Sequence, residues 1–436
     1  MKDLNKQLIG FIASCPSMFH TAGTIGRMLS ENGFERLEEG KPWKLAPGKY
    51  FVTRNDSSII AFDIPTKIES YHFQLCASHG DSPTYKVKAE GELSGPFEYL
   101  RLDVEGYGGM LDATWFDRPL SLAGRVLVRE GEKIVSKLLY IDRDILIIPS
   151  LCIHMNREAN SGFAYNKAVD LCPLFSNGEL KKGDLDKMIA KELKAKAEDI
   201  VSKDLFLVSR QEGRVWGYKK EFLSAPKLDD LQAAFASLKG FLEAENKGCI
   251  NVYVCFDNEE VGSATKQGAL STFLKDTLER INEQLGKSRE DLRVALAKSF
   301  LVSFDNAHAV HPNHPEKSDS VNQCFMNRGL VIKENAAQKY TTDAFSRAVF
   351  LEVCKRAGVP TQVFANRSDM AGGGTLGNIS NAQVSLHAVD IGIAQLAMHS
   401  SYETAGSLDT QYAVSAMKEY YSSLIKIEDS ESISIK

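Results

Sequence analysis

Three stretches of the chain have the pattern of a buried strand that ends in a polar turn. Residues 71–83, 249–263 and 299–313 each contain a run of apolar, mostly β-branched or aromatic positions, followed by His, Asp, Asn or Glu. Segments with helical spacing lie elsewhere in the chain, at 265–285 and 343–358. Apolar strands that alternate with helices are typical of a mostly parallel sheet covered by helices on both faces. The pattern therefore predicts an α/β fold.

The middle of the chain has a different pattern. Residues 122–149 contain short apolar runs joined by the turn sequences EGEK and DRD, which is typical of antiparallel β-structure. One amphipathic helix is predicted over 185–201. We therefore expect an α/β domain formed by 1–91 and 222–436, with a β-rich domain, 92–221, inserted into it.

The composition limits the classes of partner. Of the 436 residues, 43% are hydrophobic and 25% charged, as in a globular protein, and no run of about 18 apolar residues predicts a membrane span. The net charge of -5 argues against nucleic acid as a partner. The first residues lack the apolar core of a signal peptide, so the eight cysteines are expected to be reduced thiols of a cytoplasmic protein. No CxxC pair is present, so we do not expect a thiolate zinc site.

Two glutamates, Glu259 and Glu260, stand side by side directly after the apolar run 250–256. Neighbouring carboxylates repel each other, so a buried pair requires something that separates their roles. The alternative is that the strand has reached the surface and that both charges are solvated. Ligand-type residues at the ends of other predicted strands favour a site.

Such residues follow several predicted elements. His79 and Asp81 end the first strand, and a metal-bound histidine commonly donates its second ring N–H to a carboxylate. Asp305 ends another strand, and three histidines follow within nine positions. Asp229 stands at a predicted helix start and His399 follows an apolar run. Taken singly, Asp229 is more simply explained as a helix N-cap, and His399 as a core histidine.

Taken together, these donors indicate a metal centre, made by His79, Asp229, Glu260, Asp305 and His399. Imidazole and carboxylate donors without thiolate suit zinc, manganese or cobalt. Five ligands are too many for one open tetrahedral site and suit two metal ions that share a carboxylate. A metal lowers the pKa of its water to about 7, and Glu259, left free, could accept the proton as a general base. The residues thus predict metal-assisted hydrolysis of an amide.

Six motifs, in this order along nearly the whole chain, resemble those of the M18 family of metallo-aminopeptidases, the aspartyl aminopeptidase group: SHGDSP (78–83), KLDD (227–230), DNEEVGS (257–263), DNAHAVHPN (305–313), VIKENAAQKY (331–340) and LAMHSSYETAG (396–406). The resemblance implies a zinc-peptidase-like catalytic domain that holds two metal ions. It implies that one ion is bound by His79, Asp229 and Asp305, and the other by Asp229, Glu260 and His399. It also implies that Glu259 is the general base and that Asp81 orients His79.

The resemblance further implies how substrate and subunits are arranged. His308 would contact the substrate carbonyl, and Lys333 and Tyr340 would line the pocket for the N-terminal side chain. His154 would reach into the site of a neighbouring subunit. The inserted domain would then serve dimerisation, and the dimers would build a tetrahedral dodecamer that restricts the site to short peptides with a free N-terminus.

Two positions depart from the family pattern. Asp230 stands where the family's usual Arg-Leu-Asp-Asn motif has asparagine, and the glycine-rich segment 368–377 replaces a more polar one. We expect a preference for an N-terminal Asp or Glu, because Lys333 offers a cation to the substrate carboxylate. A neutral or basic preference is the alternative that these departures leave open.

Three other functions stay open on the sequence. A dimetal carboxypeptidase or deacylase would use the same core but would not need a free substrate amine. A phosphoesterase would gather basic residues around its metals, and near the motifs only Lys227 and Lys333 stand out. A catalytically silent assembly protein would be expected to lack a ligand, whereas every expected one is present.

Overall fold

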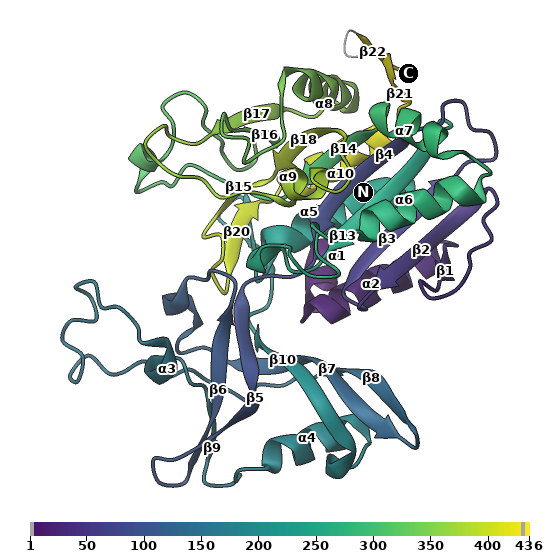
Figure 1. Cartoon of the computed structure of the whole chain (residues 1–436). Helices are drawn as coiled ribbons and strands as arrows, with labels where there is room; N and C mark the ends of the chain where they lie inside the picture. Colours follow the sequence, from purple (N-terminus) through teal and green to yellow (C-terminus); the bar gives the residue numbers. More distant parts are fainter. Residues whose placement is uncertain (1–3, 429–431) are drawn as a thin grey trace.

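The computed structural model describes residues 4–428 and 432–436. A nine-stranded sheet organises its larger part (Figure 1), in the order β1-β2-β3-β13-β4-β14-β18-β16-β17. Its strands are β1 (Glu35–Leu37), β2 (Gly48–Arg54), β3 (Ser58–Ile64), β4 (Phe73–His79), β13 (Ile250–Phe256), β14 (Phe300–Phe304), β16 (Leu330–Glu334), β17 (Thr361–Ala365) and β18 (His387–Gly392). The central strands β13, β4, β14 and β18 are mutually parallel, and β3 pairs antiparallel with β2 and β13. The predicted α/β fold with a mostly parallel sheet is confirmed.

Helices cover both faces of this sheet. One face is covered by α1 (Leu4–Ala13), α2 (Met18–Glu31), α5 (Leu228–Glu243), α8 (Ala344–Ala357) and α10 (Asp409–Ser422). The other is covered by α6 (Phe273–Gln284), α7 (Arg289–Ala297) and α9 (Leu376–Asn381). Successive strand residues point to opposite faces, so Cys76 of β4 packs in the first apolar core and its neighbour Leu75 in the second.

A separate antiparallel sheet forms the lower part of Figure 1, in the order β8-β7-β10-β5-β6-β9. Its strands are β5 (Thr84–Ser94), β6 (Tyr99–Tyr107), β7 (Leu120–Glu130), β8 (Lys133–Tyr140), β9 (Leu174–Asn177) and β10 (Ile200–Ser209). Helix α4 (Asp184–Leu193) packs on it through Leu185 and Ile189, and the short helix α3 (Lys167–Asp170) lies beyond a long loop. The predicted β-rich second part is confirmed; its strand β5 begins at Thr84, before the expected border at residue 92.

A third, five-stranded sheet lies beside the first, in the order β11-β12-β20-β19-β15. Its strands are β11 (Arg214–Trp216), β12 (Phe222–Ala225), β15 (Ala307–His308), β19 (Ala394–Leu396) and β20 (Glu403–Gly406). A hairpin of β21 (Ile425–Glu428) and β22 (Ser432–Ile435) closes the chain. No described helix is long and apolar enough to cross a membrane.

Two predicted helices are shorter than their sequence patterns. The helix expected over 265–285 begins at Phe273, because the residues before it form turns in which Gly268 lies against the backbone of Ser263. The helix expected over 185–201 ends at Leu193, where Lys194 adopts a left-handed conformation with φ +52°. The short 3-10 turn 197–199 then leads into β10.

Candidate metal centre

Three adjacent parallel strands deliver candidate ligands to one edge of the large sheet. β4 ends at His79; β13, on one side of it, is followed by Glu259 and Glu260 in a 3-10 turn; β14, on the other side, is followed by Asp305. The carboxyl ends of parallel strands are where α/β proteins build their sites. The strand order therefore places these side chains together, although more than 200 residues separate some of them in sequence.

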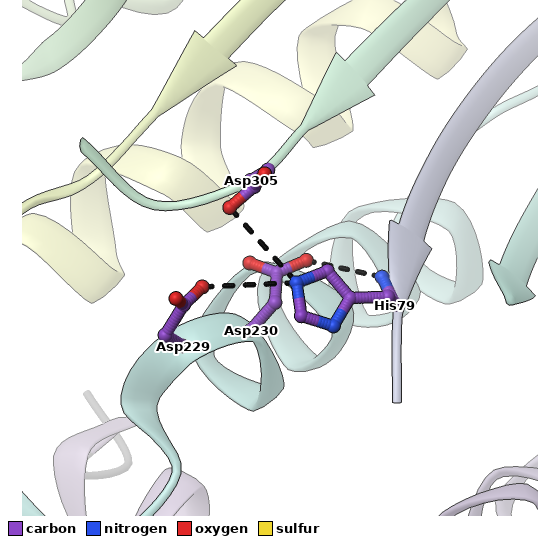
Figure 2. Close-up of side chains that lie close together, drawn as sticks. All are labelled: His79, Asp229, Asp230 and Asp305. Atoms are coloured by element: carbon purple, nitrogen blue, oxygen red, sulfur yellow. Dashed lines mark hydrogen bonds and ion pairs between the residues drawn. The ribbon is translucent and has the colours of Figure 1, made fainter. Parts of the chain in front are cut away.

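His79 and Asp305 meet the start of helix α5 at this edge (Figure 2). Nε2 of His79 lies 3.7 Å from Oδ1 of Asp229 and 4.0 Å from Oδ1 of Asp305. One donor atom from each of His79, Asp229, Asp230 and Asp305 lies within 4.8 Å of the others, and all four side chains are buried. Zinc holds such donors at about 2.0–2.2 Å, which separates them by roughly 3–4 Å. The cluster therefore has nearly the spacing of a metal site.

A second cluster shares Asp229 with the first. Nε2 of His399 lies 3.3 Å from Oδ2 of Asp229 and 3.4 Å from Oε2 of Glu260. The three donors lie within 4.8 Å of one another. Asp229 thus directs one oxygen toward His79 and the other toward His399, the arrangement of a carboxylate that bridges two ions.

Three buried carboxylate oxygens without hydrogen-bond partners in the described part of the chain indicate that a cation could bind here. Oδ1 of Asp229, Oδ1 of Asp230 and Oε1 of Glu260 are buried and accept no hydrogen bond from the described residues. A buried carboxylate oxygen without a partner is costly, and a coordinated cation would satisfy it. Carboxylate and imidazole donors suit zinc, manganese and cobalt. The residues present therefore fit divalent metal ions.

The electrostatics of the cluster agree with this fit. Burial raises the pKa of Asp305 to about 8, in spite of the nearby Lys333. Burial, with Asp229 close by, also raises the pKa of Glu260 well above its usual value. Burial opposes the charge of His399, but hydrogen bonding to Asp229 prevails and raises the pKa of His399 to about 8. The carboxylates of the cluster outnumber its cationic side chains, and bound metal ions would neutralise the excess negative charge.

Both candidate histidine ligands have a partner for their second ring nitrogen. Nδ1 of His79 lies 3.2 Å from the backbone oxygen of Asp81 and 3.5 Å from its Oδ1, so the carbonyl is the closer acceptor. Nδ1 of His399 lies 2.6 Å from the backbone oxygen of Gly109. Such partners orient a metal-bound imidazole. The carboxylate of Asp81 also accepts the backbone N–H groups of Glu259 and Glu260, each at 3.2 Å.

Sequence reasoning missed two acidic residues that hold ligands in place. Glu403 accepts the backbone N–H of Asp229 at 2.9 Å and that of His399 at 2.7 Å. Asp230, noted in the sequence only as an added charge, accepts the backbone N–H of His79 at 3.1 Å. Glu403 lies in the motif YETAG, but nothing in a single sequence indicates that its carboxylate turns back to two ligands.

The expected substrate-binding residues occupy different surroundings. Nζ of Lys333 is buried, where it donates to the backbone oxygens of Asp305 at 2.8 Å and Asn306 at 3.2 Å and lies 5.2 Å from the ring centre of Tyr340. His308 lies on β15, next to the ring of Phe364. Both segments therefore border the metal cluster through Asp305.

His154 is not brought to the cluster within this chain. It lies in the exposed loop between β8 and α3 (Figure 1), and it makes no hydrogen bond, ion pair or ring contact with residues 4–428 or 432–436. A role for His154 in catalysis would therefore need a second subunit.

Comparison with known proteins assigns the family. The family described as aminopeptidase I zinc metalloprotease (M18) matches residues 11–421. The chain belongs to the M18 family of aminopeptidases. The prediction of a metallo-aminopeptidase is thereby confirmed, and the buried cluster of histidine and aspartate agrees with a zinc enzyme.

Relatives of this M18 enzyme align over nearly its whole length. It is 47% identical to the probable M18 family aminopeptidase 2 of Clostridium acetobutylicum, over 95% of this chain and 98% of that protein. It is 37% identical to aspartyl aminopeptidase 1 of Schizosaccharomyces pombe, over 97% and 95%. Among solved structures, a chain of the Ape4 and Nbr1 complex superposes with a TM-score of 0.94 at 36% identity, over 97% of this chain and 86% of that one. The mApe1 dodecamer of S. cerevisiae gives 0.83 at 26% identity, over 96% of each.

Proposed function

We propose that this M18 aminopeptidase uses two divalent metal ions to remove an N-terminal residue, with Asp or Glu preferred, from short peptides. The observation that carries the proposal is the pair of donor clusters that share Asp229. His79 and Asp305 would hold one ion with Asp229, and Glu260 and His399 would hold the other. Zinc is the expected metal, and manganese or cobalt could bind to the same donors.

Bound ions would supply Lewis-acid activation of a water molecule. The chain's own residues would do the rest. Glu259 would accept a proton from the attacking water and pass it to the leaving amine. Asp81 would act as a positioning residue, because it holds the backbone N–H of Glu259 and lies against the ring of His79. His308 would donate to the substrate carbonyl.

The acidic preference is supported by one relative and one cation. The S. pombe relative is named an aspartyl aminopeptidase and is 37% identical to this chain. Lys333 is a buried ammonium beside Tyr340, and two of its three N–H donors go to backbone oxygens. The ammonium also forms a 3.9 Å ion pair with Oδ2 of Asp305, and its third N–H would be available for a charge-assisted hydrogen bond to the carboxylate of a substrate side chain.

We also propose that the antiparallel sheet domain, residues 92–221 with its first strand, joins subunits, as the dodecameric relative suggests. Exposed apolar side chains, Leu151, Ile153 and Met155, flank His154, so a partner surface would cover this loop. His154 would then enter the partner's active site. A cytoplasmic location would suit the eight cysteines, all of them described and unpaired.

The function is tested with free-amine substrates that carry Asp, Glu, Leu, Lys or Ala at the N-terminus, each with zinc, manganese or cobalt. We expect native protein to favour Asp and Glu, and Glu259→Gln to lose at least about 100-fold in kcat. Glu283→Gln, on the exposed side of α6, is the matched control. Cleavage of N-acetylated peptides would favour a deacylase or carboxypeptidase, and no cleavage with any metal would favour a silent assembly protein.

The same panel tests Lys333. We expect Lys333→Met to lower the ratio of Asp to Leu cleavage by about tenfold or more, because the charge-assisted bond is lost. Lys339→Met, an exposed lysine of the same motif, should leave the ratio unchanged. An equal loss on all substrates would contradict the acidic pocket and would leave Lys333 as a support of Asp305. A native preference for Leu or Lys would establish the neutral or basic alternative.

A further inference from the structure

One short segment of the antiparallel sheet domain reaches the metal cluster. Residues 107–111, the 107–111 segment, begin with the last residue of β6, a strand whose end points toward the large sheet in Figure 1. Gly108 packs against Glu260: a Cβ added at Gly108 would lie 3.2 Å from the Cβ of Glu260. The φ of Gly108, +79°, also favours glycine. The backbone N–H of Leu111 donates to the carbonyl of His399 at 3.0 Å. The segment therefore touches a ligand residue from each of two distant parts of the chain.

Tyr107 acts on the His79 side of the cluster. Its hydroxyl donates to Oδ2 of Asp81 at 2.8 Å and accepts from Nδ2 of Asn258 at 2.8 Å. Asp81 is the residue whose backbone and carboxylate oxygens face Nδ1 of His79. Its carboxylate also holds the backbone of Glu259, so Tyr107 supports the common anchor of a metal ligand and the general base.

Gly109 acts on the His399 side. A carbonyl oxygen only accepts hydrogen bonds, so the 2.6 Å contact between Nδ1 of His399 and the oxygen of Gly109 requires the proton on Nδ1. In the neutral ring the lone pair then lies on Nε2, the nitrogen that faces Asp229 and Glu260. The carbonyl of Gly109 thereby selects the tautomer that can bind a metal.

We propose that the 107–111 segment is part of the active site, and that the antiparallel sheet domain completes the metal centre in addition to any role in assembly. Tyr107 is a positioning residue that acts through Asp81, and the Gly109 carbonyl positions His399. The inference rests on the proposed two-metal function. The competing explanation is that these contacts only hold two domains together.

Tyr107→Phe tests the inference by removing one hydroxyl from the full-length chain. The control is Tyr85→Phe: Tyr85 is a buried tyrosine of the adjacent strand β5, and its hydroxyl donates to Asp112 at 2.6 Å. Zinc stoichiometry and affinity would be measured by equilibrium dialysis against a competing chelator. We expect Tyr107→Phe to lose about 10- to 100-fold in affinity for at least one ion, the usual effect of removing an outer partner. Tyr85→Phe should match the native chain.

Kinetics supply the second measurement. At saturating zinc, Tyr107→Phe should lower kcat with little change in KM, because the hydroxyl supports Glu259 rather than the substrate. If Tyr107→Phe fails to fold, Gly108→Ala replaces it; the new methyl group would press on Glu260 without removing a hydrogen bond, and zinc affinity should fall. If the native chain and the folded variant bind zinc equally tightly, the role of the 107–111 segment is wrong, while the two-metal function is unaffected. A native chain that binds fewer than two ions would overturn the two-metal function itself.

Discussion

Asp230 is a second acidic residue next to Asp229 inside the metal cluster. Its carboxylate is fully buried beside Asp229 and Asp305, and Oδ1 accepts no hydrogen bond from the described residues. Burial raises its pKa well above the usual value for an aspartate, although His79 opposes this. In the metal-free protein, the buried carboxyl group of Asp230 therefore lowers the stability of the folded state.

Asp230→Asn removes this buried ionisable group and keeps an oxygen that can accept the backbone N–H of His79. We expect the metal-free variant to be more stable than the native chain by about 1–3 kcal/mol, because an unpaired buried carboxylate is lost. Added zinc should stabilise the variant less than it stabilises the native chain, since one negative charge near the ions is gone. Urea unfolding with a chelator and with zinc measures both effects. Lower stability of the variant in chelator would show that the charge itself supports the metal-free fold.

At the scale of elements, His72 ties the start of β4 to β13. It is buried just before β4, its backbone oxygen accepts the N–H of Ile250 at 3.0 Å, and Nδ1 lies 3.0 Å from Oγ of Ser70. Burial lowers the pKa of His72 from 6.5 to about 4. Protonation of this one side chain therefore opposes the folded state in which β4 and β13 carry His79 and Glu260 to the site.

The sign of the pH effect follows from this lowered pKa. Between pH 6.5 and 4, the unfolded chain binds a proton at His72 that the folded chain does not. The contribution to stability is complete above pH 6.5 and is lost as the pH falls through 4, by about 3 kcal/mol in total. His72→Gln should therefore show a shallower loss of stability over this interval, measured by urea unfolding in chelator. Parallel pH curves for the two proteins would contradict a neutral His72 in the fold.

At the scale of the whole molecule, we proposed that His154 of one subunit enters the active site of its partner. This proposal predicts that two inactive variants can restore activity when they form a mixed dimer. Glu259→Gln and His154→Ala should each be nearly inactive by themselves. In a mixed dimer, the subunit with intact Glu259 would receive His154 from its partner, and one of the two sites would work. Random pairing at equal expression should therefore restore about a quarter of the native activity per site in the unselected pool, and about half in mixed dimers separated from the homodimers.

Co-expression of the two variants with different affinity tags, followed by purification through both tags, isolates the mixed assemblies. Assays on these assemblies check the prediction, and a mixture made after separate purification is the control for exchange. Activity no greater than the sum of the separate variants would argue that His154 serves no neighbouring site. Mass measurement in solution would report whether the assembly is the dodecamer that the relatives suggest.

The residues alone predicted that several candidate ligands would lie close together, and the structure brings His79, Asp229 and Asp305 into one buried cluster. His79 is the last residue of β4, Asp305 directly follows β14, and Glu260 lies in the turn after β13; strand and turn are local patterns set by side-chain periodicity and charge. The carboxyl ends of parallel strands lie at the same edge of an α/β sheet, so the sequence alone predicts that these residues lie close together. The donor chemistry, imidazole and carboxylate without thiolate, likewise follows from residue type.

Tertiary structure decided which groups surround these ligands. Tyr107 meets Asp81 across 26 positions, Gly109 meets His399 across 290, and Glu403 meets Asp229 across 174. Two of these contacts use backbone atoms, which every residue carries and which leave no mark in a sequence. The start of α6 at Phe273 was similarly set by the packing of Gly268 on Ser263 rather than by helical spacing. Side-chain chemistry and periodicity are properties of the sequence, whereas the partners of a buried group depend on which distant segments the fold brings into contact.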